Sequence, residues 1–226
     1  MTFRFRLLDA MDELPARLRQ DIMRELEAAY ERIARLVRLD RLDVVVAPDA
    51  WVLPAYGFSG FANGPGRITI GVDPASPRLH DPERSDRLFG TLAHEMHHVV
   101  RLRSGVETYT LGGRFVSEGL AQCFEEQAGA PTPFYAVALD RETLTKMADR
   151  ARPLLAATDF EHDTWMFGRK NDPEWPRSAG YSLGYALMKA WLAWKGLTAL
   201  DAAGVPAAEV TDDWQAGRVS LALPPR

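Results

Sequence analysis

The chain has 226 residues, of which 46% are hydrophobic and 26% charged, as in an ordinary globular protein. Its net charge of −4 argues against nucleic acid as a partner, because nucleic-acid-binding proteins usually carry a basic face. The one cysteine, Cys123, excludes both an intrachain disulfide and a cysteine-rich zinc site.

The N-terminal residues contain no apolar run long enough for a signal peptide. No stretch of the sequence approaches the roughly 18 apolar residues of a transmembrane helix. We therefore expect a cytoplasmic protein without a membrane partner. The sequence does not indicate an oligomeric state.

The hydrophobic pattern predicts a helical segment, then a small sheet, then a series of helices. Apolar residues spaced by three and four from Glu13 to Leu39 predict one long amphipathic helix or two joined ones. Strands are expected at 43–47 and 67–72, with glycine-rich turns between them. Further helices are expected at 81–103, 114–128, 141–156 and 178–195, with an ordered loop at 159–177 and at most two short helices after 198.

These elements together predict an α+β fold that is mainly helical. No internal repeat or low-complexity linker divides the chain, so we expect a single domain over residues 1–226. Its expected parts are an N-terminal helical segment (1–42), a small sheet (43–73), a block of helices (81–196) and a C-terminal tail (197–226).

Residues 94–98 read His-Glu-Met-His-His, which is an H-E-x-x-H motif within a predicted helix. Residues four apart share a helix face, so His94 and His98 can bind one zinc ion, and Glu95 can reach a water on it. At about 100° per residue, the two histidines share a stripe with Thr91 and Arg101, away from the apolar face. This separation favours a metal site over a pair of core histidines.

The third protein ligand of a catalytic zinc ion has to come from another segment. On the next predicted helix, Glu118 shares one face with Gln122 and Glu125, while Leu120 and Phe124 lie opposite. An antiparallel pair of helices would bring this polar stripe to the histidines. We prefer Glu118 as the third ligand. Glu125 is the rival, and both remain compatible with ordinary solvated glutamates.

These motifs resemble those of a known family. H-E-x-x-H followed by Ser117-Glu-Gly-Leu-Ala121 resembles the gluzincin metallopeptidases. With Gly180-Tyr-Ser-Leu-Gly-Tyr185, the chain is more specifically similar, over roughly residues 68–195, to a bacterial family of predicted zinc-dependent proteases of unknown function. The resemblance implies a zincin-like domain that hydrolyses peptide bonds of a peptide or protein substrate. It also implies one zinc ion on His94, His98 and Glu118, with Glu95 as general base.

The sequence departs from the gluzincin pattern in two places. Many gluzincins carry an acidic residue four positions after the ligand glutamate, where this chain has Gln122. We expect the Gln122 carbonyl to accept an imidazole N–H, and we expect Glu125 beside the ligands as well. The aminopeptidase motif G-x-M-E-N is absent, because Phe61-Ala-Asn-Gly64 does not supply its glutamate, so aminopeptidase activity is not indicated.

An enzyme of this kind also needs a donor for the oxyanion. Tyr181 is our candidate, with Tyr185 and His162 as alternatives, and Tyr181 is equally compatible with a core tyrosine. His97 lies off the stripe of His94 and is expected at the surface or behind the ligands. Cys123 lies on an apolar face and is expected to be buried and inert.

Three other interpretations remain open. The first is a non-peptidase zinc hydrolase with the same ligands. The second is a zinc-binding regulatory module without turnover, in which Glu125 or His162 would be a fourth ligand. The third is a chance motif without a metal. If 67–72 is an edge strand beside the H-E-x-x-H helix, an extended substrate could add to it as a further strand.

Overall fold

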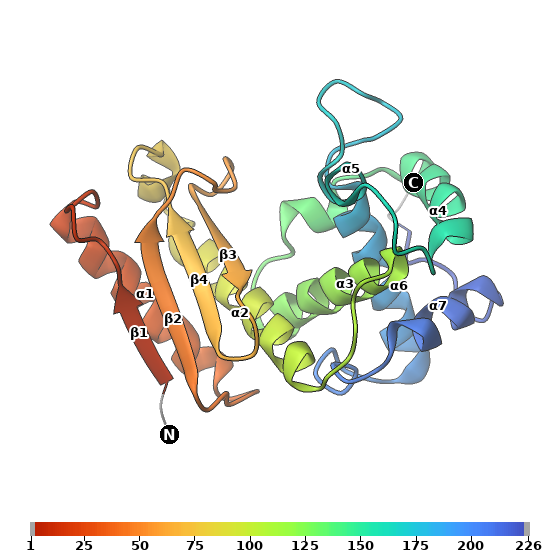
Figure 1. Ribbon diagram of the computed structural model, residues 1–226, viewed down its shortest axis with the longest axis horizontal. Coiled ribbons are helices and arrows are strands. Elements are labelled where there is room, and N and C mark those ends of the chain that lie inside the picture. The colour runs from red at the N-terminus through yellow and green to blue at the C-terminus, as the bar shows by residue number, and fades with distance from the viewer. Residues whose placement is uncertain (1–2, 224–226) are drawn as a thin grey trace. The chain divides into compact units, whose positions relative to one another are not determined.

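The computed structural model describes residues 3–223, which form four strands and seven α-helices (Figure 1). This arrangement confirms the predicted α+β class. The elements are β1 (Phe3–Leu7), α1 (Ala16–Ile33), β2 (Leu42–Pro48), β3 (Phe58–Ala62), β4 (Arg67–Val72), α2 (Arg84–Arg103), α3 (Leu111–Ala128), α4 (Arg141–Ala151), α5 (His162–Phe167), α6 (Ala179–Lys195) and α7 (Ala207–Gln215), with 3-10 helices at Pro77–His80, Phe134–Val137 and Arg152–Leu154.

The internal contacts of the chain fall into two compact units. The first comprises Met1–Arg103 with Ala128–Pro131, and the second comprises Ser104–Gln127 with Thr132–Arg226. The expectation of one domain over 1–226 stays a prediction. Within the described part of the chain, no helix combines the length and the apolar character that crossing a membrane requires.

The first unit contains a four-stranded sheet in the order β1-β2-β4-β3. β1, β2 and β4 are parallel, and β3 runs antiparallel to β4. The helices α1 and α2 contact each other, and α2 contacts β3 and β4 (Figure 1). Alternate strand residues are fully buried, including Val44, Val46, Ile68 and Ile70. This period of two gives the sheet one apolar face and one polar face.

The helix α1 buries an apolar stripe formed by Leu18, Ile22, Leu26 and Ile33. The predicted helical segment 13–39 is therefore one helix, which ends at Ile33. Its polar side is joined to α2, because the guanidinium of Arg84 donates two hydrogen bonds to the Glu25 carboxylate, at 2.6 and 3.0 Å.

The helix α2 begins at Arg84, three residues later than the sequence suggested. Residues Pro77–His80 form a separate 3-10 helix, which Asp81 caps at its C-terminal end. The Asp81 carboxylate accepts a hydrogen bond from Arg87 at 2.8 Å. The predicted end of α2 is close to the observed one, since the helix stops at Arg103 and Gly105 has a φ of +75°.

In the second unit, α3 and α6 cross with their backbones in direct contact. A methyl group on Gly119 would overlap the carbonyl group of Gly184, and one on Gly184 would overlap the carbonyl oxygen of Phe115. Only glycine permits this approach, so the crossing fixes α6 against the part of α3 that carries Glu118. α3 begins at Leu111, earlier than expected at 114.

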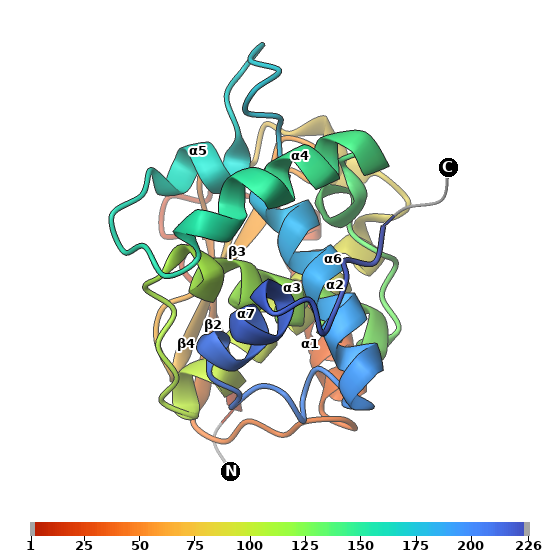
Figure 2. The same cartoon turned by 90° about the vertical axis from the view of Figure 1, so that its right-hand side faces the viewer.

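Other helices of the second unit surround α6, which contacts α4 and α5 (Figure 2). α4 ends at Ala151 and continues as the 3-10 helix Arg152–Leu154, so the predicted helix 141–156 is shorter than expected. The predicted loop 159–177 contains the short helix α5. The remainder, 168–177, projects from the unit in both views (Figures 1 and 2). Between residues 198 and 223, the structure has one α-helix, α7.

Candidate metal centre

The two histidines of the H-E-x-x-H motif lie one turn apart on α2. The centroids of the His94 and His98 rings are 4.7 Å apart, with the ring planes at 76°. His94 is buried, with 6% of its surface exposed, and His98 is half-buried. The spacing of four residues places both rings on one side of the helix, as the sequence predicted.

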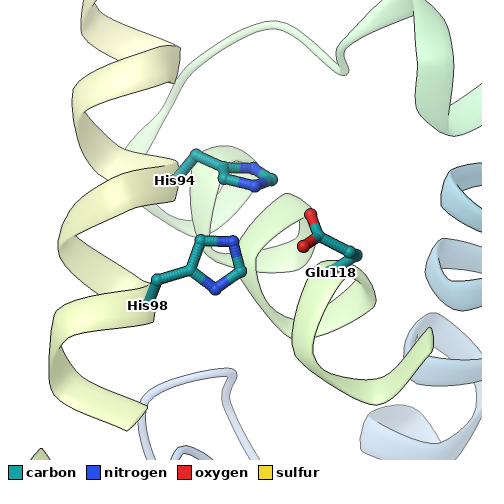
Figure 3. A group of neighbouring side chains, drawn as sticks. All are labelled: His94, His98 and Glu118. Atoms are coloured by element: carbon teal, nitrogen blue, oxygen red, sulfur yellow. The ribbon is translucent and has the colours of Figure 1, made fainter. Parts of the chain in front are cut away.

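The carboxylate of Glu118 completes a group of three possible metal ligands. His94, His98 and Glu118 each offer one ligand atom, and these atoms all lie within 4.8 Å of one another. Figure 3 shows both imidazoles on one helix and the carboxylate on another, with the three side chains turned toward a common point. Two imidazoles and one carboxylate are a donor set that is compatible with zinc. The rival, Glu125, is not in this group.

Glu95 lies against the strand β3. A methyl group on Gly60 would stand 2.6 Å from Cγ of Glu95 and 2.7 Å from Cγ2 of Thr91. Real side chains do not approach so closely, so β3 can pass over Glu95 only because residue 60 is glycine. Glu95 is also buried, with 7% of its surface exposed.

The edge strands of the sheet are β1 and β3, so the condition that 67–72 forms an edge is not met. β4 lies between β2 and β3, because β3 pairs with β4 from Phe58↔Val72 to Ala62↔Ile68. Within residues 3–223, no further strand of the sheet pairs with the other side of β3, where Phe58 forms a single antiparallel bridge with Leu53. One edge of the sheet, open beyond Phe58, therefore belongs to the strand that contacts Glu95.

The polar stripe of α2 is much more buried than its composition suggested. Arg101 has only 1% of its surface exposed, and this burial lowers its pKa to about 10. His97 is completely buried, so of its two expected positions, at the surface or behind the ligands, the surface is excluded. The helical wheel separates polar from apolar residues, but it does not show whether packing covers the polar side.

The face of α3 that carries Glu118 also carries Gln122 and Glu125. Gln122 is completely buried, and neither of its amide atoms has a hydrogen-bond partner among the described residues. The expected hydrogen bond from an imidazole to the Gln122 carbonyl is therefore not formed. Glu125 is 3% exposed and accepts a hydrogen bond from the Tyr135 hydroxyl at 3.2 Å.

The candidate oxyanion donors differ in their surroundings. The Tyr185 hydroxyl donates to Glu126 at 2.6 Å, and burial together with this carboxylate raises its pKa to about 12. Tyr185 is thus held by a structural hydrogen bond. Tyr181 is half-buried, and its ring packs against those of Tyr135 and Phe167, with centroids 5.2 and 5.8 Å away. His162 lies exposed on α5, outside the group of three ligands.

Glu126 is a residue that the sequence analysis missed. Its carboxylate accepts hydrogen bonds from Tyr185 and Lys189 of α6 and from Thr132. No local signal could have revealed this network, because Tyr185 and Lys189 lie 59 and 63 residues away along the chain. Cys123 on the same helix is buried, as expected, and burial raises its pKa to about 12.

The fold and the site define an α+β protein with an H-E-x-x-H helix and a histidine, histidine and glutamate donor group. The model of the family described as predicted Zn-dependent protease (DUF2268) matches residues 22–212, and the chain belongs to this family. This match confirms the resemblance inferred from the three motifs. No curated protein and no solved structure matches the chain.

Proposed function

We propose that the protein is a zinc metallopeptidase that binds one zinc ion through His94, His98 and Glu118. The observation that carries the proposal is the convergence of three ligand atoms within 4.8 Å, two of them from an H-E-x-x-H helix. A structural zinc site has four protein ligands, whereas a catalytic one has three and an open position. A group of three therefore favours an enzyme over a regulatory module.

The proposed chemistry is divided between the metal and Glu95. A bound zinc ion would activate a water molecule and polarise the scissile carbonyl group. Glu95 takes a proton from this water and transfers it to the leaving amine, as general base and then general acid. Its position, about 100° around the helix from His94, suits a base beside the metal rather than a further ligand. Tyr181 remains our candidate for the oxyanion donor.

The exposed edge of β3 offers a binding track for the substrate. An edge strand presents unpaired N–H and C=O groups, to which an extended peptide can add. Because β3 contacts Glu95 at Gly60, a peptide on this edge would lie close to the general base. A backbone track of this kind suits a peptide better than a small ester, and this supports peptide-bond hydrolysis.

Metal analysis of the purified protein tests the ligand set. We expect about one zinc ion per chain in the wild type and a large loss of zinc in His94→Ala and in Glu118→Ala. Glu125→Ala is the matched control on α3 and should keep the metal. Wild-type protein that takes up no divalent metal, even after reconstitution, would contradict the proposal.

A second variant separates the metal from the catalysis. Glu95→Gln should keep its zinc and lose hydrolysis of a mixed peptide library by at least about a hundredfold, the lower end of the range for general acid–base catalysis. Glu83→Gln changes an exposed glutamate just before the same helix and should leave turnover unchanged. Turnover in Glu95→Gln at the wild-type rate would rule out Glu95 as the base.

A further inference from the structure

A continuous row of six rings runs across the second unit. We call it the aromatic row, and its members in order of contact are Phe134, Tyr135, Tyr181, Phe167, His162 and Phe160. Successive centroids are 5.2 to 6.5 Å apart, which is the range of favourable edge-to-face and tilted pairs. The residues come from the 3-10 helix Phe134–Val137, the start of α6, and α5 with the residue two before it.

None of these six rings is fully buried. Phe134 and Phe167 are 47% and 48% exposed, His162 is also exposed, and the remaining rings are half-buried. Isolated apolar residues on a protein surface are common, but a contiguous exposed row is typical of a binding surface. The three exposed rings, Phe134, Phe167 and His162, therefore give the row a surface that a bound molecule can contact.

The second ring of the aromatic row, Tyr135, is hydrogen-bonded to the helix face that carries Glu118. The Tyr135 hydroxyl donates to Glu125, which lies seven residues after Glu118. Seven residues are about two helical turns, so Glu118 and Glu125 lie on the same side of α3. The ring of Tyr135 is thus tied to the same face as the proposed zinc ligand, and Tyr181 packs on Tyr135.

The charges near the row favour a peptide over a nucleic acid. Asp159, Glu161 and Asp163 stand beside the rings of Phe160 and His162 along the chain and are all exposed. Nucleic-acid platforms combine stacking rings with a basic groove, because the phosphates require it. Arg169 and Lys170 follow Phe167, but three carboxylates stand beside the other end of the row, and the protein as a whole is acidic, which favours a peptide.

We propose that the aromatic row binds an aromatic or large aliphatic side chain of the peptide substrate, close to the bond that is cleaved. The proposal rests on the proposed peptidase function and adds its substrate class, which is peptides with a bulky apolar residue near the cleavage site. Phe167 is the central contact, since it touches both Tyr181 and His162 and has a half-open ring.

The test compares two fluorogenic peptide libraries that differ only in one fixed residue, Phe in one and Ala in the other. Wild-type protein should cleave the Phe library with the higher kcat/KM. Phe167→Ala should lower kcat/KM for the Phe library about tenfold, the size expected for one lost aromatic contact, and leave the Ala library nearly unchanged. For the Phe library, the kcat/KM of Phe167→Leu should lie between those of the wild type and Phe167→Ala, because leucine keeps an apolar side chain.

Tyr109→Ala is the control, because Tyr109 is 67% exposed in the same unit but lies outside the row. It should cleave both libraries as the wild type does. Equal losses for both libraries in Phe167→Ala, or a wild type without preference for Phe, would overturn the proposal while leaving the peptidase function intact. Thermal unfolding of each variant checks that the fold is retained.

Binding measurements keep the proposal testable if no turnover is found. Fluorescence anisotropy with the labelled Phe and Ala peptides and Glu95→Gln protein reports affinity without hydrolysis. Tighter binding of the Phe peptide that Phe167→Ala abolishes would support the aromatic row even if the peptidase proposal fails. Equal affinity for the two peptides would refute it.

Discussion

Gly60 of β3 and Glu95 of α2 are in contact at a point where no side chain larger than hydrogen fits. A methyl group added to Gly60 would stand 2.6 Å from Cγ and 3.0 Å from Oε1 of Glu95. The edge strand and the proposed general base therefore constrain each other. A change in the strand would therefore reach the proposed general base without touching a proposed metal ligand.

Gly60→Ala should lower turnover while leaving zinc binding intact. The new methyl group would push against Glu95 and Thr91, and such overpacking costs about 1–3 kcal/mol. We expect kcat to fall at least about tenfold, since a displaced base is no longer aligned with its water. Gly66→Ala is the control, because its methyl group would be 3.7 Å from the nearest atom, the carbonyl oxygen of Arg41. Unchanged kcat in Gly60→Ala would show that β3 shifts without moving Glu95.

Gly119→Ala should destabilise the protein strongly. Its methyl group would overlap the backbone of Gly184, which cannot rotate away as a side chain can. A loss of about 3 kcal/mol corresponds to a fall in Tm of roughly 6–12 °C for a chain of this size. Gly204→Ala meets only Ser104, at 3.6 Å, and should change Tm little. Differential scanning calorimetry measures both, and equal Tm values would contradict the close crossing of α3 and α6.

Glu126→Gln should reduce stability at neutral pH more than in acid. Burial raises the pKa of Glu126, but hydrogen bonds from Lys189, Thr132 and Tyr185 outweigh it and hold the pKa below 4.5. A carboxylate whose pKa is lowered by folding stabilises the folded state at pH values above the pKa that it has in the unfolded chain. This contribution is lost as the pH falls through the pKa that it has in the folded protein. We expect a loss of about 1–3 kcal/mol at pH 7, which shrinks below pH 4.5.

Urea unfolding of Glu126→Gln and wild type across this pH range provides the measurement. The exposed pair Glu142–Lys146 supplies the control, because Glu142→Gln removes an ion pair worth less than about 1 kcal/mol. A loss in Glu126→Gln that is the same at pH 7 and pH 3.5 would mean that the charge of Glu126 contributes nothing.

The thiol of Cys123 should react only after unfolding. Burial raises its pKa to about 12, so only about one thiol in ten thousand is ionised at pH 8. We expect the native protein to resist a disulfide-exchange reagent for hours and the denatured protein to react within minutes. One equivalent released quickly from the native protein would show that the thiol is accessible.

The sequence was most informative where function depends on neighbours along one helix. The sequence placed His94, His98 and Glu118 together, and their ligand atoms lie within 4.8 Å of one another, while metal binding by them stays a prediction. Helix geometry fixes how residues three or four apart lie relative to one another, so a motif within a helix predicts which of its side chains share a face. The predicted C-terminal ends of α3 and α6 also agree with the observed ends, because a glycine with positive φ follows each helix as expected.

Contacts between segments that are far apart along the chain could not be predicted from the sequence. Strand β1 was missed although Phe3, Phe5 and Leu7 alternate with arginines, because five residues at a terminus carry a weak signal. The role of Gly60 depends on which strand passes over Glu95, and hydrophobic patterning does not fix strand order. The aromatic row likewise joins residues 134 to 181, which only the fold brings into contact.

The division of the chain into two units limits how the protein can be dissected. Ala128–Pro131 cluster with the first unit, although the residues before and after them belong to the second. A gene fragment that stops at Arg103 would therefore lack four residues of its own unit, and a single protease cut could not release either unit whole. Deletion mapping of this protein should use internal loops such as 168–177, not a truncation series.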